Sequence, residues 1–187
     1  MSIGMIGSSA VILVAMALAG YAVIIFNSLV RLKNNIRKSW ANIDVLLKQR
    51  NDELPNLVNA VKGYMKHEKK VLVELTKARA SILNAQTLPQ KARADGAITK
   101  ALKTLFAVSE NYPVLRANEN FMQLQGRISG LENEIADRRE FYNDGVTNYN
   151  TRIQSFPDIM IAKMLSYSEE ALFKATEQEK KTVNIEV

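Results

Sequence analysis

Few residues in this sequence have side chains suited to metal or acid–base chemistry. The chain of 187 residues has one histidine, His67, and no cysteine. His67 lies in the charged run 66–70, KHEKK, which is typical of a solvated surface. A di-iron site in a helical protein needs two Glu-x-x-His pairs on facing helices. A zinc site needs several histidine or cysteine ligands. We therefore predict neither a metal site nor a cofactor.

Carboxylates are the second candidate for chemistry, and one predicted helix carries four of them: Glu132, Glu134, Asp137 and Glu140. The same stretch carries three arginines: Arg127, Arg138 and Arg139. Pairing at i,i+4 explains this mixture better than acid–base catalysis does. A serine nucleophile would lack its histidine base, because the one histidine lies in the charged run. Gly126 and Gly130 are not followed by the GK[ST] ending of a phosphate-binding loop. We predict no catalytic residue and no enzymatic activity.

Residues 141–157, FYNDGVTNYNTRIQSFP, contain a repeated aromatic–amide pair. The pairs are Tyr142-Asn143 and Tyr149-Asn150. Such a group could bind a ligand, but a spacing of seven residues also places both pairs on one face of a helix. We therefore interpret the stretch as packing between helices.

Two asparagines near the N-terminus, Asn27 and Asn34, have the same spacing. In an antiparallel pair of helices, Asn150 would lie near Asn27 and Asn143 near Asn34. Buried amides lower stability but fix the register of two helices. We predict two such polar layers.

The elements that must position these residues begin with an apolar run. Ile3–Phe26 has 24 residues without a charged side chain. As a helix it would be about 36 Å long, which exceeds a hydrocarbon core of roughly 30 Å. Ala17-Leu18-Ala19 resembles a signal-peptide cleavage site, but the run is too long and no basic residue precedes it. We predict an uncleaved transmembrane anchor over residues 1–26, with a short external N-terminus.

Basic residues follow the anchor without an acid before Asp44, and we call them the basic collar: Arg31, Lys33, Arg37 and Lys38. The positive-inside rule places the following domain in the cytoplasm. The formal net charge is +6, and the collar suits anionic lipid head groups. Lysines on the second helix lack a groove-reading motif or interleaved aromatics, so we predict no nucleic-acid partner.

Small residues gather on one side of the anchor, and we call this side the small-residue face: Gly4, Ser8, Ala15, Ala19 and Ala22. Small side chains allow membrane helices to approach closely. The composition of membrane helices in general is the alternative explanation. We expect this face to support homo-oligomers.

Apolar residues at helical spacing predict four helices within residues 27–156, which we expect to form an all-α, antiparallel up-down bundle. The sequence NDELP at 51–55 predicts a break between the first two helices, with a kinked continuous helix as the alternative. Asn118 is the expected N-cap of the last helix. A dimer of long hairpins is the alternative to a monomeric bundle.

The third segment comprises residues 157–187. Its apolar stretch follows Phe156-Pro157 and contains Ile159, Met160, Ile161 and Leu165. This stretch could lie at the membrane interface, contact a neighbouring protomer or fold back on the bundle. The alternation at 183–187 could add as a strand to a partner, or the tail could be disordered.

Three blocks of this sequence resemble the LemA family of bacterial membrane proteins. They are FNSLVRLKNNIRKSWANIDVLLKQRNDELPNLVNAVKGYMKHE, YPVLRANENFMQLQ and ENEIADRREFYNDGVTNYNTRIQSFP. The resemblance implies one N-terminal transmembrane helix and a cytoplasmic antiparallel bundle, with no catalytic residues to carry over. One branch of the family is associated with magnetosomes and is linked to the formation of a membrane organelle.

From these observations we expect a single-pass protein of the bacterial inner membrane. Its expected role is a self-assembling scaffold that organises or remodels that membrane, with lipids and other copies of itself as partners. The alternative is an adaptor that presents the bundle or the tail to another membrane protein, whose identity the sequence does not give.

Overall fold

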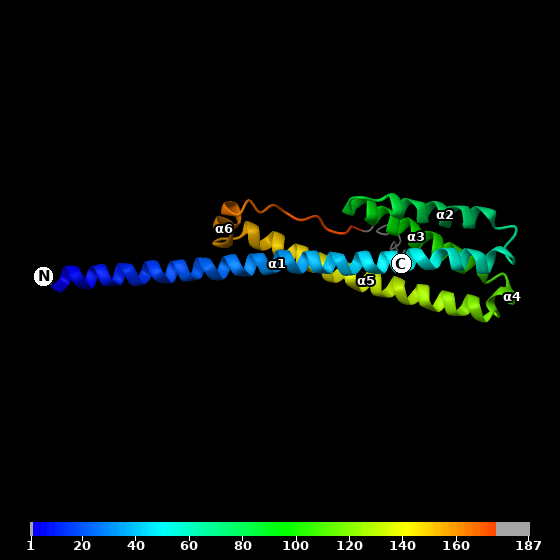
Figure 1. Ribbon diagram of the computed structural model, residues 1–187, viewed down its shortest axis with the longest axis horizontal. Coiled ribbons are helices and arrows are strands. Elements are labelled where there is room, and N and C mark those ends of the chain that lie inside the picture. Colours follow the sequence, from blue (N-terminus) through cyan, green and yellow to red (C-terminus); the bar gives the residue numbers. More distant parts are fainter. Residues whose placement is uncertain (1, 175–187) are drawn as a thin grey trace, which may run out of the picture. The chain divides into compact units, whose positions relative to one another are not determined.

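The computed structural model describes residues 2–174, and for residues 2–7 and Ser9 it describes the backbone alone. Within this range the chain forms six α-helices and no strand (Figure 1). The helices are α1 (Ser2–Lys62), α2 (Lys69–Asn84), α3 (Leu88–Ser109), α4 (Pro113–Arg116), α5 (Glu119–Gln154) and α6 (Asp158–Met164). The predicted all-α class is confirmed. The alternating sequence 183–187 lies outside the described residues.

The first helix does not break where the sequence predicted. α1 has 61 residues and runs through Pro55 to Lys62, so the break expected at 51–55 is wrong and a continuous helix is present. Proline lacks an N–H, which leaves the carbonyl four residues earlier without its helical donor. Arg79 of α2 donates from Nε to that carbonyl, the one of Asn51, at 3.5 Å. The connection to α2 comes later, after Lys62.

Side-chain caps define the starts of α3 and α5. Thr87 and Gln90 form a capping box at α3: the Gln90 N–H donates to Thr87 Oγ1 at 3.4 Å, and the Thr87 N–H donates to Gln90 Oε1 at 3.2 Å. At α5 the Phe121 N–H donates to Asn118 Oδ1 at 3.1 Å. The prediction of Asn118 as the N-cap is confirmed.

The helices are distributed over two compact units. Among the described residues, the first unit comprises 2–39 and 143–172, and the second comprises 40–142 and resumes at Phe173. Both α1 and α5 contribute to each unit. The three segments predicted from the sequence, with boundaries after residues 26 and 156, describe topology instead of packing and stay a prediction.

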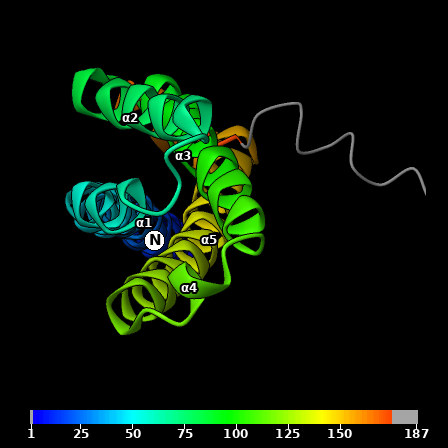
Figure 2. The same cartoon turned by 90° about the vertical axis from the view of Figure 1, so that its right-hand side faces the viewer.

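The second unit is an antiparallel bundle in which the chain reverses direction from α1 to α2, from α2 to α3 and again into α5 (Figures 1 and 2). Figure 2 shows these four helices round a common centre. The core contains one inward row from each helix. Fully buried members include Leu57, Leu75, Ile98, Leu105 and Ile128. No single helix could bury such a row alone, so the apolar core requires the bundle.

The first unit combines the N-terminal part of α1 with the end of α5, with α6 and with the chain that follows α6. α1 is long and apolar enough to cross a membrane, with a mean hydropathy of 2.3 over an 18-residue window. The apolar side chains from Val11 to Leu18 are exposed, as expected of a segment that meets lipid.

Candidate functional site

The predicted packing role of the aromatic residues agrees with their burial. Tyr142 and Tyr149 are 3% and 0% exposed, and both belong to a seven-residue row on α5 with Phe121, Ile128 and Ile135. The Tyr149 hydroxyl donates to the Ser168 carbonyl at 3.2 Å. Burial raises the pKa of Tyr149, and the nearby Glu170 carboxylate and Tyr167 add to the rise. The phenol is therefore held in its neutral, donating form.

The predicted asparagine layers are not formed. Asn150 uses its amide on the backbone of Glu170: Nδ2 donates to the Glu170 carbonyl and the Glu170 N–H donates to Oδ1, both at 2.9 Å. Asn27 and Asn34 are exposed, so neither forms a buried layer. Asn143 is half-buried and has a partner. The sequence pattern identified helix spacing correctly but missed a competitor for the amide of Asn150.

That competitor is the segment following α6, residues 166–172, which we call the strap. Besides its contacts with Tyr149 and Asn150, it carries Tyr167, whose ring centroid is 6.1 Å from that of Tyr149. Lys33 of α1 lies over the Tyr167 ring at 4.3 Å and pairs with Glu170 at 3.8 Å. The strap thus connects α5 and α1 within the first unit.

The basic collar lies on α1, and one of its members contacts other parts of the first unit. Arg31, Arg37 and Lys38 are exposed, whereas Lys33 is half-buried by its contacts with the strap. On the small-residue face, Ser8, Ala15 and Ala19 are exposed and Ala22 is half-buried. Gly4 lies among the residues whose side-chain positions are not described.

The apolar stretch after Phe156 forms α6, whose two sides differ. Asp158 and Ala162 are buried in the first unit. Pro157, Ile159, Ile161 and Leu165 are half-buried. Phe156 and Met160, together with Met164, are exposed. Folding back therefore holds for one side of α6, and the membrane and neighbour alternatives apply to the other side.

An arginine that the sequence reasoning missed fixes α6. Arg152, in the last turn of α5, donates from Nε to Asp158 Oδ2 at 2.6 Å and pairs with the same oxygen through Nη2. Its Nη1 donates to Ser28 Oγ of α1. One side chain therefore connects α5, α6 and α1 in the first unit.

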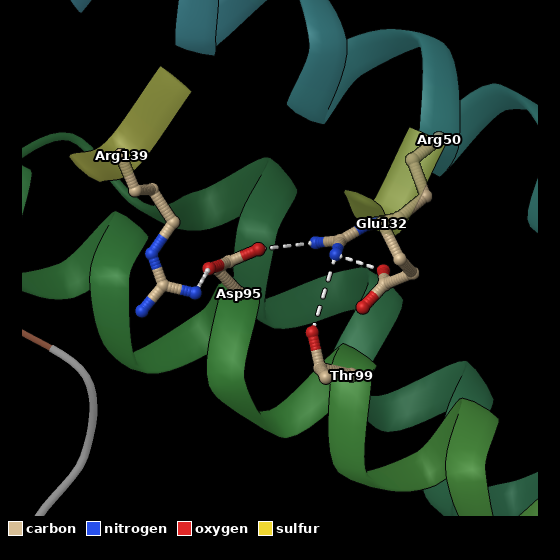
Figure 3. Close-up of polar contacts among 5 residues, drawn as sticks. All are labelled: Arg50, Asp95, Thr99, Glu132 and Arg139. Atoms are coloured by element: carbon tan, nitrogen blue, oxygen red, sulfur yellow. Dashed lines mark hydrogen bonds and ion pairs between the residues drawn. The ribbon is translucent and has the colours of Figure 1, made fainter. Parts of the chain in front are cut away.

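A buried charged cluster in the second unit is the other site that the sequence reasoning missed (Figure 3). Arg50 of α1 is 0% exposed and its Nη2 lies 2.7 Å from Asp95 Oδ1 of α3. Its Nη1 contacts Glu132 of α5 and donates to Thr99 Oγ1 at 3.4 Å. Arg139 of α5 reaches the second carboxylate oxygen of Asp95 at 3.1 Å. We call these five residues the charged cluster.

The prediction of i,i+4 pairing on α5 holds for one of its arginines. Arg138 pairs with Glu134 at 3.6 Å and both are half-exposed. Arg139 and Glu132 instead reach α3 and α1. These two residues therefore join α5 to other helices instead of pairing along α5 itself.

Periodicity offered a signal for the charged cluster. Arg50 continues the row of Ile43 and Leu47, and Leu54 follows it at the same helical spacing. Asp95 similarly precedes Ile98 on α3. A charged residue within an apolar row predicts a buried charge that needs a partner on another helix.

The charged cluster is suited to holding three helices in register. Two guanidinium groups face two carboxylates, so its charges balance, and the side chains of Arg50 and Asp95 are closed to solvent. Substrate could not reach either without separating the helices. Among the described residues no group of three metal-ligating side chains occurs.

The carboxyl group of Asp95 is expected to titrate at a higher pH than that of an ordinary aspartate. Burial raises its pKa above 3.8 and Glu132 adds to the rise, while Arg50 and Arg139 oppose it. A raised folded-state pKa means that the folded protein binds this proton more tightly than the unfolded chain. The stability that Asp95 contributes is thus fully present below pH 3.8 and is lost as pH rises through the raised pKa. Carbon NMR of labelled aspartate, assigned with Asp95→Asn, measures this titration. A midpoint below 3.8 would show that the arginines outweigh burial.

The fold and the apolar helix define the class of the protein: a helical bundle carried by one N-terminal helix that could span a membrane. The LemA family model matches residues 39–187, and the chain belongs to the LemA family. The family match begins at the end of the first unit's share of α1 and includes the charged cluster and the strap.

Individual relatives agree with this assignment. The chain is 29% identical over 162 residues to Protein LemA of Metamycoplasma hominis, which covers 84% of this chain and 73% of that protein. It is 36% identical over 64 residues to Magnetosome protein MamQ 2 of Paramagnetospirillum magneticum. It is 31% identical over 64 residues to Magnetosome protein MamQ of Magnetospirillum gryphiswaldense. Both magnetosome matches cover 34% of this chain and 24% of the relative.

Proposed function

We propose that this protein is a non-enzymatic scaffold that is anchored in the bacterial inner membrane by α1, assembles with copies of itself and organises or remodels the membrane. The observation that carries the proposal is the composition of the first unit. The apolar part of α1 belongs to the same compact unit as the end of α5, α6 and the strap. No loop interrupts α1 between its apolar part and these contacts.

This arrangement favours a scaffold over a flexible tether. In a tethered protein a linker would separate the membrane helix from the folded part. Here Ser28 and Lys33, just beyond the apolar run, are both held by other elements of the unit. A displacement of the apolar part of α1 would thus be transmitted directly to the other elements of the first unit. The basic collar supports a cytoplasmic orientation, with the N-terminus outside and anionic head groups beside Arg31 and Arg37.

The small-residue face supplies the surface for self-assembly. Ala15 and Ala19 are exposed in the single chain, so their side of α1 is open to a second helix. The chain is also similar over 64 residues to two magnetosome proteins, and this similarity supports the resemblance to the magnetosome-associated branch of the family.

Enlarging this face should reduce self-assembly. Ala15→Leu/Ala19→Leu is expected to shift the reconstituted protein toward monomers, because the added side chains keep the helices apart. Ala10→Leu/Ala17→Leu is the matched control: it adds the same side chains about 200° round the helix, where both alanines are also exposed. Cross-linking yield and electron microscopy in lipid measure assembly. Equal assembly of the two variants, or a monomeric parent protein, would contradict the proposal.

A groove on the second unit favours the adaptor as a second candidate. Between α1 and α2 lies a hollow of about 390 Å³, with apolar walls that include Val58, Leu72 and Val73. Val73 is 48% exposed, which suits the docking of a partner helix. Cross-linking in cells from a photoreactive residue at position 73 tests this candidate. A single foreign partner would favour the adaptor, and products with the protein itself would favour the scaffold.

A further inference from the structure

α6 presents two chemically different sides. Residues two apart on a helix point about 200° away from each other. Asp158 and Ala162 are 8% and 1% exposed, whereas Met160 and Met164 are 64% and 71% exposed. Phe156 lies in the turn between α5 and α6 and is 82% exposed. Three large apolar side chains, two on α6 and one in the turn before it, are therefore exposed on the first unit. We call Phe156, Met160 and Met164 together the outer face of α6.

The position of the outer face is fixed by Arg152. This side chain joins Asp158, at the start of α6, to Ser28 of α1. Ser28 lies two residues beyond Phe26, where the apolar run ends, and precedes the first charged residue, Arg31. α6 is thus held beside the point at which α1 would leave the hydrocarbon core.

The charges around the outer face suit a lipid surface. Lys163, on the last turn of α6, and Arg31 are exposed cations. The carboxylate of Asp158 faces inward and is paired with Arg152. Of the acids of the strap, Glu170 pairs with Lys33 at 3.8 Å, while Glu169 is exposed and accepts a hydrogen bond from Gln154 at 2.8 Å. An exposed apolar face flanked by cations is the pattern of a helix that lies in the interface of an anionic membrane.

We propose that the outer face of α6 is a second membrane contact, in which Phe156, Met160 and Met164 insert into the boundary between head groups and acyl chains in the leaflet that α1 leaves. The proposal rests on the anchoring of α1 in a bilayer. It sharpens the role of the stretch after Phe156, because Ile159 and Ile161 are half-buried by the protein and the methionines carry the lipid contact. Together, α1 and α6 would give the first unit two points of attachment and a defined tilt on the membrane.

The absence of cysteine from the chain permits a direct test with single nitroxide labels. Met160→Cys and Met164→Cys carry the test labels in the full chain, reconstituted in vesicles of phosphatidylethanolamine and phosphatidylglycerol. Val14→Cys is the lipid reference on the apolar part of α1. Met122→Cys, at an exposed methionine of α5, is the aqueous reference. The measured quantity is the ratio of label collisions with oxygen, which dissolves in lipid, to collisions with a water-soluble nickel complex.

The ratio at Met160 and Met164 should be several-fold above that at Met122 and should not change when the protein is diluted in lipid. A ratio equal to that at Met122 would overturn the second contact. Protection that disappears on dilution would overturn it too, because a second copy would then be the occupant. A low ratio at Val14 would refute the anchor itself, whereas a high ratio at Val14 with aqueous values on α6 would refute the second contact alone.

Discussion

Replacing Arg50 with alanine is expected to lower the free energy of unfolding of the bundle by about 3–5 kcal/mol. The substitution leaves Asp95, whose side chain is fully buried, with one arginine partner instead of two, and it removes the partner that Glu132 has on α1. An uncompensated buried charge, together with the volume lost, accounts for the expected size. Denaturant unfolding followed by circular dichroism in detergent measures the change.

Two further variants separate burial from charge. Arg138→Ala removes an arginine from a pair in which both side chains, Arg138 and Glu134, are 49% exposed, and it should cost at most about 1 kcal/mol. Arg50→Lys keeps the charge but loses the two-pronged geometry that reaches Asp95 and Glu132 together, so it should stay well below the parent protein in stability. Equal stability of Arg50→Ala and Arg138→Ala would contradict the role given to the charged cluster.

Phe173→Ala is the second substitution with a large expected effect, about 3–5 kcal/mol, since a buried phenylalanine leaves both a cavity and lost apolar contact. Phe173 is 1% exposed, and its ring centroid lies 5.9 Å from that of Trp40. The Arg139 guanidinium lies over the ring at 4.8 Å. Loss of this anchor in the second unit should also make the adjacent strap more sensitive to protease.

Phe141→Ala is the matched control, because Phe141 is 65% exposed on α5 and its removal should change the unfolding free energy by no more than about 0.5 kcal/mol. Thermal unfolding and the rate of limited proteolysis test both variants under the same conditions. Similar melting temperatures and cleavage rates for the two would show that Phe173 does not hold the chain in place.

Local signals in the sequence were sufficient for most of the fold. Apolar spacing predicted the all-α class, Asn118 was correctly identified as a cap, and the row through Tyr142 and Tyr149 is buried. Each of these features depends on residues within a few turns of one another. The break predicted before Pro55 is wrong, and the Asn51 carbonyl that Pro55 leaves without a helical donor accepts from Arg79, which is distant in sequence.

The candidate sites depended on pairs distant in sequence, which a single sequence does not reveal. Asn150 could satisfy its amide with Asn27 or with a passing backbone, and only the path of the strap decides between them. The place of Arg50 in an apolar row predicts a buried charge. No local pattern identifies Asp95 as its partner. The charged cluster explains the register of α1 and α5 better than the predicted asparagine layers do.

The composition of the first unit has a consequence for biogenesis. This unit joins residues 2–39 to residues 143–172, so the ribosome must finish most of the chain before the unit can close. α1 is synthesised first and lacks its partners in this unit until Arg152 and the strap have been made. In a nascent chain that stops before the strap, Lys33 would lack its contacts and the first unit would stay open. The strap therefore marks the point in synthesis at which the first unit can close.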